Sequence, residues 1–134
     1  MMMRCREIFD AAIRVVCEDV TSTEGLEDYA DRAPYLLATF LSQCAPIDKR
    51  YRKVNGLSPI TYEETAAVNM EDDFPLCSVF FPAAIYYLSA MLVIDESETL
   101  SDKFFSLYTD AIVSIQADLA CMQEQIVDRY GLTK

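Results

Sequence analysis

The feature that most constrains this sequence is a long stretch without any charged residue, from Phe74 to Ile94. Its length is close to the roughly 20 apolar residues that a helix needs to cross a bilayer. Prolines within it, acidic residues on both sides and the lack of a nearby lysine or arginine argue against a membrane span. We therefore expect a kinked helix that its neighbours bury on nearly all sides, at the centre of a small helical bundle.

The composition is typical of one packed globular domain spanning residues 1–134. Hydrophobic residues make up 52% of the chain and charged residues 25%, and there are only 3 glycines. The 22 acidic and 11 basic side chains give a net charge of -11, which repels nucleic-acid phosphates and anionic membrane surfaces at long range. We expect no sequence-specific nucleic-acid binding and no membrane association, because such an excess of acid commonly serves solubility.

The chain carries little that points to catalysis. It has no histidine, which removes the usual di-iron bundle sites, zinc proteases and histidine-based triads. The isolated glycines form no phosphate-binding loop, and the acidic residues at 71–73 and 95–98 lack the spacing of a calcium loop. We expect no enzyme activity, no cofactor and no metal. The cysteines form no C-x-x-C pair and are expected to be reduced, small core residues: Cys5, Cys17, Cys44, Cys77 and Cys121.

Periodic apolar residues predict two amphipathic helices in the first third of the chain. The first runs from Arg4 to Val20, and capping residues at 21–24 separate it from the second. The second has apolar residues at steps of three and four, and Pro46 is expected to end it. Pro34 lies inside this second helix and predicts either a kink or a late start near Ala33.

The helical period is lost between Ile47 and Asp73, which predicts an irregular loop before the central helix. Asn55 and Gly56 could form the turn of a hairpin from Tyr51 to Tyr62. Asp48 to Val54 could equally form a helical turn that ends with Asn55 or Gly56 as a left-handed cap. We favour the helical turn slightly.

Two further helices are predicted in the second half of the chain. Glu71 to Asp73 provide a cap and negative charge for the start of the central helix, which is expected to run to about Ile94 with a distortion at Pro82. A last helix is expected from about Leu100 or Ser101 to Tyr130. It is longer than a compact bundle needs, so its end is expected to project or to pack against another copy. The predicted fold class is all-α, with four helices.

A short basic segment reverses the local charge of this acidic chain: Lys49, Arg50, Tyr51, Arg52 and Lys53. One interpretation is docking onto an acidic patch, for example on another copy of the chain. The other, which we favour, is a solvated turn whose cations relieve the acidic surplus. Tyr51 could stack on a base, but one basic segment in so acidic a chain is weak support for nucleic-acid binding.

Several segments between Tyr29 and Ile115 follow one another in a recognisable order: Arg32-Ala33-Pro34-Tyr35-Leu36, the basic residues at 49–53, Asp73 to Leu76, Pro82 to Leu88, and Phe104 to Tyr108. This order resembles the small head-tail connector (adaptor) proteins of tailed phages and prophages. The resemblance assigns no individual site residue. The C-terminal extension from Gln116 to Lys134 lies outside it.

The resemblance implies a non-enzymatic helical subunit that self-associates into a ring on the portal and links the DNA-filled head to the tail. Its partners would be the portal protein and a tail or stopper protein, in the bacterial cytoplasm during assembly and in the virion if the prophage is active. The loop from Val54 to Asp73 and the last helix would make these contacts. The net charge permits a different interpretation, an acidic cytosolic protein-binding module, for example one that mimics a nucleic acid.

Overall fold

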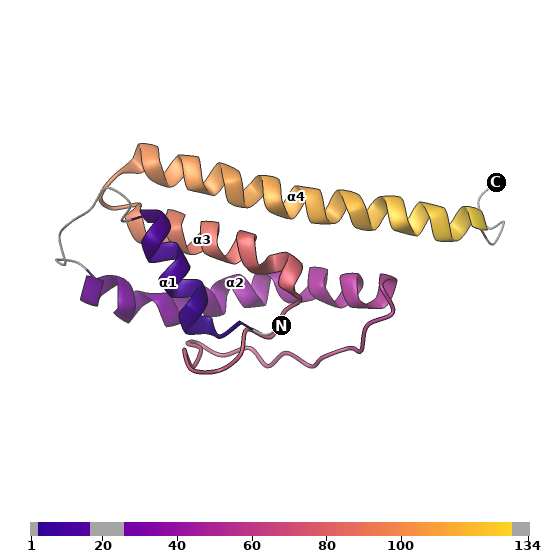
Figure 1. Ribbon diagram of the computed structural model, residues 1–134, viewed down its shortest axis with the longest axis horizontal. Coiled ribbons are helices and arrows are strands. Elements are labelled where there is room, and N and C mark those ends of the chain that lie inside the picture. Colours follow the sequence, from indigo (N-terminus) through magenta and orange to yellow (C-terminus); the bar gives the residue numbers. More distant parts are fainter. Residues whose placement is uncertain (1–2, 17–25, 130–134) are drawn as a thin grey trace.

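The computed structural model describes residues 3–16 and 26–129, which form four α-helices and no strand. The helices are α1 (Cys5–Val16), α2 (Leu26–Val54), α3 (Phe81–Val93) and α4 (Glu98–Arg129), as Figure 1 shows. The prediction of an all-α protein with four helices and a long last helix is confirmed. The capping residues at 21–24, the predicted end of the first helix and the predicted end of the last helix lie outside the described residues.

α3 is the central helix, as the uncharged run predicted. It has no charged residue and packs against α1, α2 and α4 (Figure 1). Leu88 and Leu92 are completely buried. The buried hydroxyl of Ser89 donates a hydrogen bond of 2.8 Å to the Ile85 carbonyl, so this polar group in the core is satisfied. Among the described residues, no helix combines the length and the apolar character that crossing a membrane requires.

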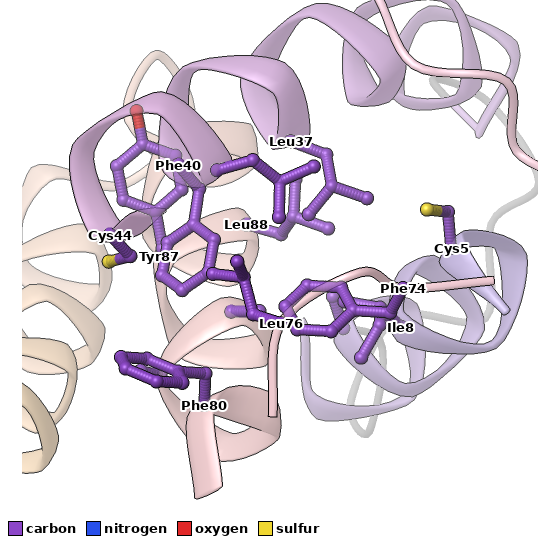
Figure 2. Packing of buried hydrophobic residues seen from close by; sticks show 14 of the residues in the cluster. Cys5, Ile8, Leu37, Phe40, Cys44, Phe74, Leu76, Phe80, Tyr87 and Leu88 are labelled. Carbon is purple, nitrogen blue, oxygen red and sulfur yellow. The ribbon is translucent and has the colours of Figure 1, made fainter. Parts of the chain in front are cut away.

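The core forms where α1, α2, α3 and the segment before α3 meet (Figure 2). Phe40 of α2 is completely buried there. Its ring centroid lies 6.2 Å from that of Phe74 and 5.7 Å from that of Tyr87. It also lies 6.1 Å from the ring centroid of Tyr108, on α4. Aromatic pairs at such separations add to the free energy of burial, so Phe40 ties three other parts of the chain to α2.

α2 is longer than predicted because it continues through both of its prolines. It begins well before Ala33, so the alternative of a late start there is wrong, and it runs past Pro46 to Val54, so the predicted end is also wrong. A proline removes one hydrogen bond from the helix interior. Packing outweighs that loss, because Ile47, Tyr51 and Val54 continue the core-facing side of the helix beyond Pro46.

The end of α2 is a Schellman motif. Gly56 has a φ of 68°, in the left-handed region that favours glycine. The Leu57 amide donates to the Arg52 carbonyl at 2.8 Å, and the Gly56 amide donates to the Lys53 carbonyl at 3.4 Å. These two bonds satisfy carbonyls that the end of a helix otherwise leaves unpaired. α2 therefore ends at Val54, with Gly56 as its left-handed cap.

This ending corrects the predicted loop. Residues 48–54 are helical, so the favoured interpretation is confirmed. The hairpin over 51–62 is wrong, because its first strand would have to begin inside α2 and the described residues there form no strand. The irregular chain before the helical turn of α3 is therefore residues 55–77 rather than 47–73.

The acidic residues at 71–73 do not begin α3, contrary to the prediction. Their backbone pairs with the start of α1 instead, where the Cys5 amide donates to the Asp72 carbonyl at 2.9 Å. The Phe74 amide donates to the Met3 carbonyl at 2.7 Å, which keeps the chain extended at that point. The first amides of a helix need partners from outside the helix, and this segment supplies one to α1.

α3 therefore begins later than predicted. A 3-10 turn at Ser78–Phe80 precedes it, and α3 itself starts at Phe81 and ends at Val93. Pro82 consequently lies in the first turn, where its missing amide has no partner within a helix to lose. The expected distortion at Pro82 is wrong for this reason.

α4 has 32 residues and packs mainly on α3. Its first turn is capped by Ser97, whose side chain accepts a hydrogen bond of 3.2 Å from the Leu100 amide. In Figure 1 the C-terminal end of α4 extends past the end of α2. Side chains of the predicted apolar stripe are buried along the helix: Phe104, Ile115 and Leu119.

Candidate interaction surface

The basic segment lies in the last two turns of α2, where its side chains separate into two groups. Lys49, Arg50 and Lys53 are exposed, whereas Tyr51 and Arg52 are partly buried. A helix has 3.6 residues per turn, so adjacent residues point in directions about 100° apart and cannot all face the same way. The exposed group is the part of the segment that can meet another molecule.

Arg52 attaches the irregular segment, residues 55–77, to α2. Its Nε lies 2.8 Å from Oδ2 of Asp48, whose side chain is only 1% exposed. Its two terminal nitrogens donate to the carbonyls of Ser58 and Pro75, each at 3.1 Å. The other carboxylate oxygen of Asp48 accepts a hydrogen bond of 2.9 Å from the Cys77 amide. The Asp48–Arg52 ion pair therefore attaches both ends of the segment to α2. The hydrogen bonds and the ion pair also offset the cost of burying the Asp48 carboxylate.

Tyr51 packs on the core. Its ring centroid lies 6.4 Å from that of Phe80, and the two rings meet edge to face at 76°. Phe80 is completely buried, so this contact holds the Tyr51 ring against the interior. A ring held in this way is poorly placed to stack on a base, so its geometry gives no support to the nucleic-acid interpretation.

A groove of about 460 Å³ lies beside Lys49, between α2 and the irregular segment. Its walls include exposed Pro46 and Ile60, and the Ile60 side chain is 40% exposed. Tyr62 also lines the groove, and its hydroxyl is buried without a hydrogen-bond partner among the described residues. Small-molecule sites usually enclose most of their ligand. This groove has exposed walls, so it lacks the enclosed shape of a typical small-molecule site.

α4 presents further apolar side chains to solvent. Phe105 is 44% exposed and Val113 is 55% exposed. The Phe105 ring is partly supported by Tyr108, at a centroid distance of 5.5 Å. Scattered exposed apolar residues are common on soluble proteins. Their position on a helix that extends past its neighbours makes α4 a candidate for contact with another protein.

Three of the described cysteines, Cys5, Cys44 and Cys77, are not activated thiols. Burial raises the pKa values of Cys5, Cys44 and Cys77 to about 11. Only a thiolate is a strong nucleophile, and a thiol with so high a pKa stays protonated at neutral pH. The predicted core position is confirmed for Cys5 and Cys44, but Cys121 is exposed, so it is wrong there. Cys17 lies outside the described residues.

Cys44 also belongs to a buried polar cluster that the sequence did not reveal. It interacts with Tyr108, and burial raises the pKa of Tyr108 to about 12. The Tyr108 ring centroid lies 5.3 Å from that of Tyr87. The sequence places all three residues on apolar helix faces but does not show that the faces of α2, α3 and α4 meet there. The ring contacts of this cluster join α2, α3 and α4.

Within the described residues, no group of three or more cysteine, aspartate or glutamate side chains is placed to hold a metal ion. Glu71, from the acidic group at 71–73, instead forms ion pairs with Arg6 and, at 4.0 Å, with Arg4. No protein-family model, no curated protein and no solved structure matches the chain. Its function is therefore inferred from its own residues and from the order of its segments.

Proposed function

We propose that this chain is a non-enzymatic structural subunit of a tailed phage or prophage. It is a head-tail connector (adaptor) whose copies assemble as a ring on the portal and link the DNA-filled head to the tail. The observation that carries the proposal is the reach of α4. Its 32 residues span about 48 Å at a rise of about 1.5 Å per residue, whereas α3, on which it packs, has only 13 residues. The C-terminal end of α4 lies beyond the other helices in Figure 1, which suits a subunit that joins two larger assemblies.

The segments that resemble the connector family form the body from which α4 extends. The segment from Arg32 to Leu36 lies on α2, Pro82 to Leu88 on α3, and Phe104 to Tyr108 on α4. Each contributes a buried residue to the core: Ala33, Leu88 and Phe104. The resemblance thus follows packing positions, which supports a helical body like that of the family. The end of α4 and residues 55–77 remain as the surfaces for partners.

The charges along α4 support a position close to packaged DNA. Asp102, Asp110 and Asp118 are all exposed on this helix. Carboxylates on the wall of a DNA channel repel the phosphates, so DNA can pass without adhering. The raised pKa values of Cys5, Cys44 and Cys77 support a role without covalent chemistry at these thiols.

Binding to the portal protein encoded in the same genome tests this proposal. The purified chain should co-elute with the assembled portal in size-exclusion chromatography. A variant that ends after Met122 keeps the buried Ile115 and Leu119 but lacks the far end of α4. We expect it to remain helical by circular dichroism and to lose portal binding.

The matched control is Asp118→Ala, which changes an exposed side chain of α4 and leaves the helix at full length. It should bind the portal like the unaltered chain. The proposal fails if the full chain does not bind the portal. The role given to α4 fails if the shortened variant binds as tightly as the control.

The alternative, an acidic module that mimics a nucleic acid, has no specific observation in its favour. A mimic needs carboxylates arranged like two rows of phosphates on one face. The exposed acidic residues of the described chain are distributed over α1, α2, α4, residues 63–73 and residues 95–96. This distribution is not the double row on one face that a mimic needs.

A further inference from the structure

The outer side of α2 changes from acidic to basic along its length. Asp28 and Asp31 are exposed near its beginning, and Arg50 and Lys53 are exposed near its end. With 3.6 residues per turn, these positions lie on one side of the helix, opposite the completely buried Leu37. α2 therefore presents one long exposed side whose two ends have opposite charge.

Between these charged ends the same side of α2 is uncharged. Tyr35 is 59% exposed, and Thr39 and Pro46 are also exposed. The acidic start and basic end suit the helix macrodipole. The macrodipole does not explain why the aromatic ring of Tyr35 is exposed to solvent between these charged ends. An exposed tyrosine with charged groups at the periphery is typical of a protein interface.

Arg32 lies near the acidic end of this side but is directed elsewhere. Its guanidinium donates a hydrogen bond of 2.9 Å to the Leu92 carbonyl and lies 3.9 Å from Asp95, at the end of α3. It also lies 3.3 Å from Asp28, so part of the charge of Asp28 is offset. Asp31 adds a second exposed carboxylate, so the start of α2 keeps its acidic character.

We propose that α2 of one copy packs along α2 of a second copy in the antiparallel direction, forming a two-fold symmetric dimer. In this orientation Asp28 and Asp31 of one copy lie beside Lys53 and Arg50 of the other. The symmetry axis repeats each pair, so one surface is complementary to itself. A parallel arrangement would place acidic ends together and basic ends together, so charge selects the antiparallel one.

The uncharged middle of α2 fits the same arrangement. Antiparallel packing brings Tyr35 of one copy opposite Pro46 of the other, so the exposed ring is covered near the centre of the contact. At a rise of about 1.5 Å per residue, the 29 residues of α2 provide a contact line of about 43 Å. The dimer goes beyond the proposed function and uses a different surface, since the proposed portal contacts are made by α4 and residues 55–77.

Sedimentation equilibrium of the full chain, without a portal, tests this inference. We expect a mass of twice the 15.2 kDa of one chain. Arg50→Glu with Lys53→Glu should weaken the dimer at least about ten-fold, because both ends of α2 become acidic. Asp28→Lys with Asp31→Lys should weaken it similarly, because both ends become basic. An equimolar mixture of the two double variants should dimerise again, because acidic ends then meet basic ends.

The controls make the same changes in net charge at exposed positions on other helices. Arg14→Glu with Lys103→Glu matches the acidic variant, and Asp110→Lys with Asp118→Lys matches the basic one. Both should dimerise like the unaltered chain, and circular dichroism checks that every variant is helical.

Four results would overturn the inference: an unaltered chain that is not a dimer, charge-reversed variants that dimerise normally, a mixture that does not recover, or controls that fail equally. No portal is present in this experiment, so none of these results bears on portal binding. A failure to bind the portal would in turn leave the dimer unaffected.

Discussion

The ion pair between Asp48 and Arg52 predicts a large effect from a single substitution. Arg52→Ala removes the cation that pairs with a carboxylate whose side chain is 1% exposed. It also removes the hydrogen bonds to the carbonyls of Ser58 and Pro75, while Asp48 keeps the bond from the Cys77 amide. Removing one partner of a buried ion pair costs about 3–5 kcal/mol, because the other charge stays buried and uncompensated.

Urea unfolding followed by circular dichroism measures this effect. Since domains are stable by only about 5–15 kcal/mol, the free energy of unfolding should fall by a large fraction. The midpoint of thermal unfolding should fall by roughly 10–20 °C. Arg14→Ala is the matched control, because it removes the same side chain from an exposed position on α1, away from the surface proposed for the dimer. It should change the free energy of unfolding by less than about 0.5 kcal/mol.

A double variant separates the unpaired charge from the other lost contacts. Adding Asp48→Ala to Arg52→Ala removes the carboxylate that the first substitution leaves unpaired. The combined loss should therefore be smaller than the sum of the two single losses by about 1 kcal/mol or more. Two results would refute the reasoning: a loss for Arg52→Ala no larger than that for Arg14→Ala, or losses that simply add.

Three further predictions concern local features. Gly56→Ala places a side chain at a φ of 68°, and nothing lies within 4 Å of the added Cβ. The backbone conformation alone should therefore lower the free energy of unfolding in urea by about 1–2 kcal/mol. A loss no greater than that of Gly56→Asn, which tolerates this conformation better, would contradict the prediction. Burial raises the pKa values of Cys5 and Cys44 from the ordinary 9.0 to about 11, so above pH 9.0 the folded state holds more protons than the unfolded state. The free energy of unfolding should therefore be unaffected by these thiols below that pH and should fall as the pH rises toward 11, and a level value across this range would count against their burial. In a Cys17→Ser background, exposed Cys121 should react quickly with a thiol reagent at neutral pH, and buried Cys44 should react only after denaturation. Fast labelling of Cys44 in the folded protein would show that it is not buried.

The helical bundle could be predicted because apolar periodicity reports burial directly. The uncharged sequence of α3 leaves no side that favours water, and the stripe containing Phe104, Ile115 and Leu119 follows the helical period along α4. In such segments the hydrophobic effect and helix geometry agree, so the local pattern is enough. The start of α4 was predicted close to its actual position because a polar connection separates it from α3.

The errors arose where contacts distant in the sequence decide the local structure. Pro46 reads as a helix end, but burial of Ile47 and Tyr51 carries α2 beyond it. The residues at 71–73 read as a helix start, but their backbone is paired with the start of α1. Helix signals describe what a segment favours by itself, and tertiary hydrogen bonds can override them.

The candidate interaction surface was predicted only in part for the same reason. The spacing of Asp48 and Arg52 in the sequence already permits an ion pair on one side of a helix. It does not show that Cys77 and Pro75 close over this pair, which is why Arg52 was grouped with its exposed neighbours. The remaining exposed cations of the segment, Lys49, Arg50 and Lys53, are the ones that can meet a partner.

The proposed function is tested most directly by electron microscopy of the purified portal ring mixed with this chain. We expect an added ring of density on the tail-facing side of the portal, with a rod-shaped feature in each repeat that fits the 32 residues of α4. Portal rings that gain no density, at concentrations where both proteins are folded and in excess, would contradict the assignment as a connector.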